Sequence, residues 1–295
     1  MRSVMFLLIV LTIAFCLSAQ AALPEGVAKP NVNQQALDKL GWKLGCQAYT
    51  FRAMSLFETL DLMHDLGMHY VEMYPGQKLS KESSTRVGPK MSQDEVDALI
   101  AKAKETEVTL ESFGVCDMGK DEKSAREVLD WAKKIGLPQV VSEPPVDRLA
   151  DLDKLCQEYG IKLAIHDHPK PSLYWNCDFE LKALEGKSNS IGSCADIGHW
   201  TRSGLSSPEC VKKLEGKIIE LHMKDVNEPE VKAHDMVWGS GVVGVGEILV
   251  ELKRQGFKGA FFTEYESTKG AELIGNVAKC MQWFSDQATK LAEEK

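Results

Sequence analysis

The sequence lacks the features of several protein classes. Positive charge is not in excess, because 35 Lys and Arg residues stand against 43 Asp and Glu residues and the formal net charge is −8. Broad nucleic-acid binding, which needs a basic surface, is therefore not expected. None of the eight cysteines forms a Cys-x-x-Cys pair, which argues against a thiolate zinc site. There is no low-complexity segment, and 44% hydrophobic with 26% charged residues is typical of a globular protein.

A long apolar run occurs only at the N-terminus. Arg2 precedes apolar residues from Val4 to Leu17, and Ser18-Ala19-Gln20-Ala21 follows. This pattern predicts a cleaved signal peptide over residues 1–21 and a periplasmic or secreted protein. An uncleaved anchor is an alternative, although a bilayer span needs about 20 apolar residues, and a lipoprotein at Cys16 is another. The remaining seven cysteines are too scattered for a disulfide framework, but an oxidising compartment would allow one or two bridges.

After a polar lead-in over residues 22–40, short apolar runs alternate with amphipathic stretches. Eight strands are expected at residues 44–49, 70–73, 108–115, 139–143, 161–166, 190–196, 217–223 and 259–264. The helices expected after them cover residues 55–66, 92–106, 124–135, 146–159, 178–184, 208–214, 246–255 and 271–292, the first two starting with the capping boxes Ser55/Glu58 and Ser92/Glu95. Eight such units predict an α/β fold, a single (β/α)8 TIM barrel over residues 41–295, rather than an open doubly wound sheet.

Acidic and imidazole side chains recur where these strands end, which is where a TIM barrel builds its active site. The residues concerned are Glu72, Glu143, His166, His168, Asp196, His199, His222, Lys224, Asp225 and Glu264. One such residue alone is more often structural, but their joint placement predicts a common site above the barrel axis. Mixed carboxylate and imidazole ligands suit one divalent metal ion such as Mn²⁺, Mg²⁺, Co²⁺ or Zn²⁺.

Four segments carry a family resemblance: Asp196-Ile197-Gly198-His199, His222-Met223-Lys224-Asp225, Gly239-Ser240-Gly241-Val242-Val243 and Thr263-Glu264-Tyr265-Glu266. They resemble the sugar phosphate isomerase/epimerase family, xylose isomerase-like TIM barrels among which endonuclease IV is also found. The resemblance extends from about Gly45 to Glu264. It implies a small carbohydrate substrate and a divalent metal, and barrels of this group often form homodimers. A DNA-repair nuclease is not expected, because the extra histidines of endonuclease IV after the second and third strands are missing.

The resemblance also implies a role for each matching residue. Glu143 and Glu264 would be metal ligands that double as acid and base, while Asp196 and His222 would complete the metal site. The implied substrate-binding residues are His199 and Lys224, and further candidates from the strand ends and loops are His168, His234 and Glu72. One departure is the fifth strand, where family members often carry an acidic residue and this chain has His166-Asp167-His168.

These residue types fit proton abstraction beside a carbonyl, with an enediolate stabilised by the metal. The expected function is an exported, metal-dependent sugar isomerase or epimerase. A keto-glycoside lyase or hydrolase with the same site is the alternative, because export and the lack of a phosphate-binding loop disfavour a sugar phosphate. A non-catalytic sugar-binding barrel also stays open. Away from this site, Asp178 and Glu180 are expected to be solvated charges.

Overall fold

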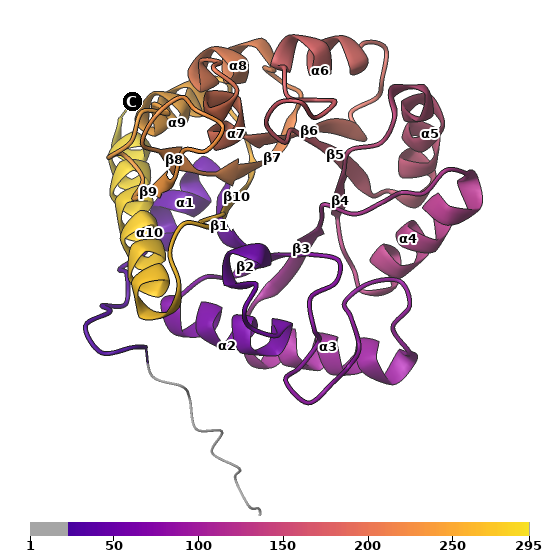
Figure 1. Cartoon of the computed structure of the whole chain (residues 1–295), viewed down its shortest axis with the longest axis horizontal. Helices are drawn as coiled ribbons and strands as arrows, with labels where there is room; N and C mark the ends of the chain where they lie inside the picture. Colours follow the sequence, from indigo (N-terminus) through magenta and orange to yellow (C-terminus); the bar gives the residue numbers. More distant parts are fainter. Residues whose placement is uncertain (1–22, 295) are drawn as a thin grey trace, which may run out of the picture.

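The structure is a computed structural model that describes residues 23–294, and in it eight parallel strands form a barrel inside a ring of helices (Figure 1). The strands are β1 (Trp42–Gln47), β2 (Tyr70–Met73), β3 (Thr109–Phe113), β4 (Gln139–Ser142), β5 (Lys162–His166), β6 (Ile191–Asp196), β7 (Ile218–Met223) and β10 (Gly259–Thr263). Their hydrogen-bonded order is β3-β2-β1-β10-β7-β6-β5-β4. The predicted TIM-barrel fold is confirmed, whereas the expected signal peptide lies outside the described residues.

A helix follows each strand on the outside of the barrel. These helices are α2 (Leu56–Leu66), α3 (Gln93–Glu105), α4 (Glu122–Lys134), α5 (Leu149–Tyr159), α6 (Cys177–Ala183), α8 (Ser207–Lys213), α9 (Val245–Arg254) and α10 (Gly270–Glu293), with short 3-10 turns η1 (Ala48–Phe51) and η2 (Val146–Arg148). Both predicted capping boxes are present, at Ser55/Glu58 and Ser92/Glu95. Each satisfies backbone N–H groups that the first helical turn leaves unpaired, so it fixes where its helix begins.

The barrel closes around a seam between β3 and β4, which are not paired as a ladder. The seam is bridged by one backbone hydrogen bond, which the Cys116 N–H donates to the Val141 carbonyl over 2.8 Å. Gly114 lies beside it, where a Cβ atom would be only 2.2 Å from the Cβ of Val141. Only glycine allows Val141 to pack this closely against the backbone at position 114.

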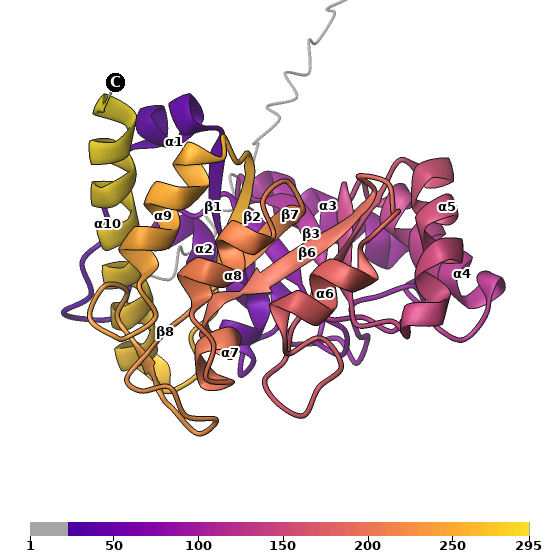
Figure 2. The same ribbon diagram turned by 90° about the horizontal axis from the view of Figure 1, so that it is seen from above.

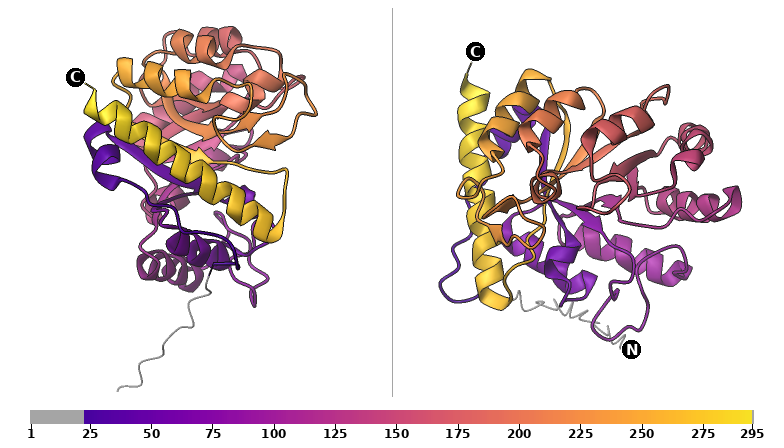
Figure 3. Two further views of the ribbon diagram at one scale, coloured as in Figure 1. Left: turned by 90° about the vertical axis from the view of Figure 1, so that its left-hand side faces the viewer. Right: turned by 45° about the horizontal axis from the view of Figure 1, so that its top comes forward.

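Two helices and one pair of short strands were not expected from the sequence. Within the expected lead-in, α1 (Gln34–Leu40) packs on α10, as the left view of Figure 3 shows. The short α7 (Ile197–Arg202) starts directly where β6 ends. Beyond β7, the loop over residues 225–236 contains an antiparallel pair, β8 (Asp225–Val226) and β9 (Asp235–Met236). Figure 2 shows α7 and β8 at one end of the barrel, the end where the parallel strands finish.

No helix within residues 23–294 is long and apolar enough to span a bilayer.

Helix α6 holds two features that bear on stability. A disulfide joins its Cys177 to Cys210 of α8, while the five other cysteines of the described residues are free and buried. The expectation that Glu180 is a solvated charge is wrong: its side chain is fully buried, and neither carboxylate oxygen is hydrogen-bonded within the described part of the chain. Burial raises the pKa of Glu180 to about 8.

We predict that the disulfide stabilises the fold by about 2–4 kcal/mol, because it closes a loop across a sequence separation of 33 residues in the unfolded chain. Urea denaturation of the oxidised protein with and without dithiothreitol measures this difference. A Cys177→Ser/Cys210→Ser variant serves as the control, since the reductant should not change its midpoint. Equal midpoints for the oxidised and reduced wild-type protein would contradict the prediction.

Glu180 should make stability depend on pH. A carboxyl whose pKa is about 8 when folded, against an ordinary 4.5, binds its proton more tightly in the folded state. The free energy of unfolding should therefore fall between pH 4.5 and 8, by up to ~1.4 kcal/mol per pH unit. Glu180→Gln should flatten this slope and be more stable than wild type at pH 8, whereas Glu185→Gln, at an exposed site just beyond α6, should keep it. Parallel wild-type and Glu180→Gln profiles in urea would refute this assignment.

Candidate functional site

The spacing of the Asp-x-x-His motif follows from its position at the junction of β6 and α7. Asp196 is the N-cap of α7, and its Oδ1 accepts a hydrogen bond from the backbone N–H of His199 over 2.8 Å. An N-cap side chain reaches the residue three positions later, which sets this spacing. The other oxygen, Oδ2, lies near the side chains of Lys224, His199 and His166.

The His-x-Lys-Asp motif at the end of β7 uses the alternation of a strand. His222 and Lys224 are both fully buried, with their side chains directed at the same group of carboxylates. The Lys224 ammonium lies 2.9 Å from Asp196 Oδ2 and 3.0 Å from Glu264 Oε2. Gly198 makes room for it, because a Cβ there would be 2.5 Å from the Cβ of Lys224. The two motifs therefore pack directly on each other.

Asp225 organises the glycine loop that follows. Its carboxylate accepts hydrogen bonds from the backbone N–H groups of Gly239, Gly241 and Val243 over 2.8 to 3.1 Å. A Cβ at Gly241 would lie 2.3 Å from Asp225 Oδ1, so glycine is required there. Asp225 thus anchors the loop at the barrel mouth rather than facing the cavity.

Four side chains converge where the strands end: His166, Asp196, His222 and Glu264. Each offers one ligand atom, and these atoms all lie within 4.8 Å of one another. His166 Nε2 is 3.1 Å from His222 Nδ1, which in turn is 2.9 Å from Glu264 Oε2. Asp196 Oδ2 and Glu264 Oε2 are buried, and each contacts the Lys224 ammonium. Two imidazoles and two carboxylates fit a divalent cation such as zinc or manganese.

Glu143, the expected fourth ligand, lies next to this group and is not one of its four members. Its Oε1 is 3.1 Å from His166 Nδ1, on the opposite edge of that ring from the site, and it also contacts His168. Burial opposes ionisation, but these two histidines hold the pKa of Glu143 down at about 2. Glu143 instead forms a second group with His166 and His168, whose ligand atoms also lie within 4.8 Å of one another. The sequence signal for His166 was its place as the last residue of β5.

A cavity of about 670 Å³ lies over the group and is lined by His166, His168, His199, His222 and Glu264 among others. Of the other expected substrate-binding residues, Lys224 and Glu72 are buried below the cavity, where Glu72 contacts His222. His234 is exposed on the β8–β9 loop and does not line the cavity. Residues that sequence reasoning missed include Arg202, one turn after His199 on α7, and Glu266, two residues after Glu264; both line the cavity.

The buried charged side chains of the site shift one another's pKa values. Burial alone would raise the pKa of Asp196, but His199 and the Lys224 ammonium hold it well below its usual range. Lys224 and His222 likewise hold the pKa of Glu264 well below its usual range. Burial and the nearby Lys224 keep the pKa of His199 well below its usual value, although Asp196 opposes this, so its ring is neutral at neutral pH. The floor of the cavity therefore holds ionised carboxylates paired with a buried lysine, while the wall at His199 is a neutral hydrogen-bonding group.

A family model described as xylose isomerase-like TIM barrel matches residues 60–287, most of the chain. The chain belongs to this family. An uncharacterised protein of Parabacteroides distasonis has a solved structure that is 33% identical, with a TM-score of 0.68 over 83% of this chain and 98% of that one. The IOLI protein, solved with a bound zinc atom, is 19% identical with a TM-score of 0.67 over 84% of this chain and 98% of that one.

Among curated proteins, inosose dehydratase of Bacillus cereus is 27% identical over 146 residues, which are 43% of this chain and 49% of that protein. The chain thus spans about half the length of the curated relatives that it matches. Proteins described as epimerases or a sugar phosphate isomerase/epimerase occur among the other solved structures of this fold, at 12–18% identity. The expected resemblance to the sugar phosphate isomerase/epimerase family is confirmed.

We predict that divalent-metal binding by this xylose isomerase-like barrel depends on His166 more than on Glu143. His166→Gln should weaken affinity beyond the ~10–100-fold typical of residues outside a ligand set. Glu143→Gln should weaken it by about 10-fold, through the lost support of His166. Isothermal titration with Mn²⁺ and Zn²⁺ measures both, with His234→Gln as an exposed control. A Glu143→Gln protein that binds metal as weakly as His166→Gln would contradict this ranking and show that Glu143 is a ligand.

Proposed function

We propose that this protein is a metal-dependent enzyme that abstracts a proton beside the carbonyl of a small carbohydrate, as a sugar isomerase or epimerase. The observation that carries the proposal is the convergence of two imidazoles and two carboxylates on the floor of a cavity that a monosaccharide unit would fit. The zinc atom of the IOLI protein supports a metal in a barrel of this fold.

The residues of the site have separate roles in metal binding, proton transfer and substrate binding. His166, Asp196, His222 and Glu264 would hold the ion, which would polarise the substrate carbonyl as a Lewis acid. Glu264 is ionised and lines the cavity, so it can accept the substrate proton. Glu143 is the second base and passes protons through His168, with which it is in contact and which faces the cavity. His199 and Arg202 line the cavity as hydrogen-bond partners for sugar hydroxyls.

A lyase that eliminates a group next to a keto carbon is the second candidate. It begins with the same proton abstraction, and the similarity to a protein named inosose dehydratase favours it. The two candidates differ only in what leaves after the proton, so one site serves both reactions. A non-catalytic sugar-binding barrel is the remaining alternative.

We further propose that the protein is exported, as the N-terminal apolar run predicts. The Cys177–Cys210 disulfide supports this, because such bonds persist mainly in oxidising compartments. Homodimer formation stays a prediction.

Solvent deuterium exchange tests the proposed chemistry. The purified protein with Mn²⁺ would be incubated in D₂O with free and 3-keto sugars and followed by NMR. We expect deuterium at the carbon beside the carbonyl and a rate at least ~100-fold lower for Glu264→Gln, because the base is lost. His234→Gln should behave as wild type.

The products separate the candidates. A deuterated stereoisomer or the isomerised ketose identifies an isomerase or epimerase, while an unsaturated ketone with a released alcohol or water identifies a lyase. Saturable sugar binding without exchange for any substrate of the panel would favour the binding protein and contradict the enzyme proposal.

A further inference from the structure

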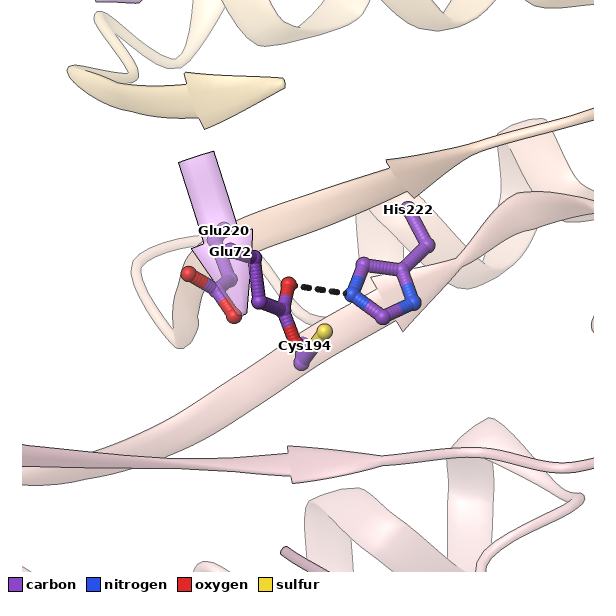
Figure 4. Close-up of side chains that lie close together, drawn as sticks. All are labelled: Glu72, Cys194, Glu220 and His222. Carbon is purple, nitrogen blue, oxygen red and sulfur yellow. Dashed lines mark hydrogen bonds and ion pairs between the residues drawn. The ribbon is translucent and has the colours of Figure 1, made fainter. Parts of the chain in front are cut away.

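His222 is held from both sides of its ring. Its Nε2 lies 2.6 Å from Oε2 of Glu72, and the close-up in Figure 4 shows this carboxylate pointing at the ring. Its Nδ1 faces the opposite way, toward Glu264 Oε2 at 2.9 Å and His166 Nε2 at 3.1 Å. Glu72 and His222 are both fully buried, so no water competes for this contact.

We propose that Glu72 is a positioning residue that keeps the His222 proton on Nε2 and so presents the Nδ1 lone pair to the metal. The inference rests on the proposed metal site. An imidazole that binds a metal through one nitrogen is neutral and carries its one proton on the other nitrogen. A carboxylate can only accept, so Glu72 selects the form protonated at Nε2 and also fixes the rotation of the ring. Carboxylates that hold a metal-binding histidine in this way raise its basicity as a ligand.

The placement of Glu72 supports this role over substrate binding. It lies in β2, on the far side of His222 from the cavity, and is not among the residues that line it. No substrate atom in the cavity could replace His222 as its partner. The sequence pointed to Glu72 as a strand-end acid, but the barrel turns its carboxylate toward the neighbouring histidine.

A second, inner ion is the competing explanation of the same contacts. Glu72, Cys194, Glu220 and His222 offer ligand atoms within 4.8 Å of one another, and Glu72 Oε1 has no hydrogen-bond partner among the described residues. However, Glu220 already accepts hydrogen bonds from Ser112 Oγ and from Gln139 Nε2. His222 Nε2 is likewise engaged by Glu72. Because Glu220 and His222 already have these partners, a hydrogen bond between Glu72 and His222 is favoured over an inner ion.

Metal affinity and stoichiometry test the proposal in four folded proteins: wild type, Glu72→Ala, Glu72→Gln and Glu220→Gln. Zn²⁺ affinity would be measured by competition with a chromogenic chelator, and bound zinc by elemental analysis. We expect one zinc per wild-type chain and a ~10–100-fold loss of affinity in Glu72→Ala. Glu72→Gln should recover part of that loss, since its amide oxygen still accepts from Nε2. Glu220→Gln, a matched change in the same barrel interior, should bind as wild type.

Each other result has a distinct meaning. Glu72→Ala with wild-type affinity overturns the positioning role and leaves the metal site standing. Two zinc ions per wild-type chain, with one lost in Glu220→Gln and in Cys194→Ser, replace the hydrogen bond by an inner ion. A wild-type protein that binds no zinc or manganese overturns the metal site and this inference together.

A measurement on the wild-type protein avoids dependence on how the variants fold. Long-range ¹H–¹⁵N spectra of the zinc-loaded protein report which nitrogen of each histidine carries the proton, and a His222→Gln spectrum assigns the signal. We expect a protonated Nε2 and a metal-bound Nδ1 for His222. A proton on Nδ1 would overturn the proposal.

Discussion

The site depends on the neutralisation of buried negative charge by one lysine. Asp196, Glu264 and Glu266 all lie within 3.2 Å of the Lys224 ammonium, which is itself fully buried. Buried carboxylates are costly unless they are paired, and here one cation pairs with the two buried ones, Asp196 and Glu264, and with the partly exposed Glu266. The surrounding features follow from this arrangement: glycine at position 198 makes space for the lysine, and α7 starts where Asp196 can cap it.

The barrel interior adds a polar layer below that site. Side chains two residues apart on a strand face the same way, so Glu220 lies directly below His222 on β7 and Cys194 below Asp196 on β6. Glu72 reaches the same layer from β2 and contacts His222. Glu72 thus contacts the metal-competent group from beneath, and Cys194 packs with Val141, Ala164 and Ile219 in a small hydrophobic cluster.

Much of the fold could be predicted because its signals are local. Capping boxes depend on two residues three positions apart, and both began their helices as predicted. Strand β2 has the predicted bounds, Tyr70–Met73. What escaped prediction depends on distant contacts: α1 is stabilised by α10, nearly the whole chain away, and β8 needs β9 as its partner. The sequence predicts a solvated charge at Glu180 because nothing in its own short helix marks it as buried.

The sequence by itself determined the eight-unit barrel and the end of it where polar residues gather. The reason is that the spacing of apolar residues in strands and helices, and the residue type at each strand end, can be read directly from the sequence. Only the tertiary structure decided which strand-end residues meet. It placed His166 in the four-residue group with Glu143 beside it, and it turned Glu72 and Lys224 inward and His234 outward. The physical reason is that strand tilt and register set the distances between side chains of different strands, and these depend on how the whole barrel closes.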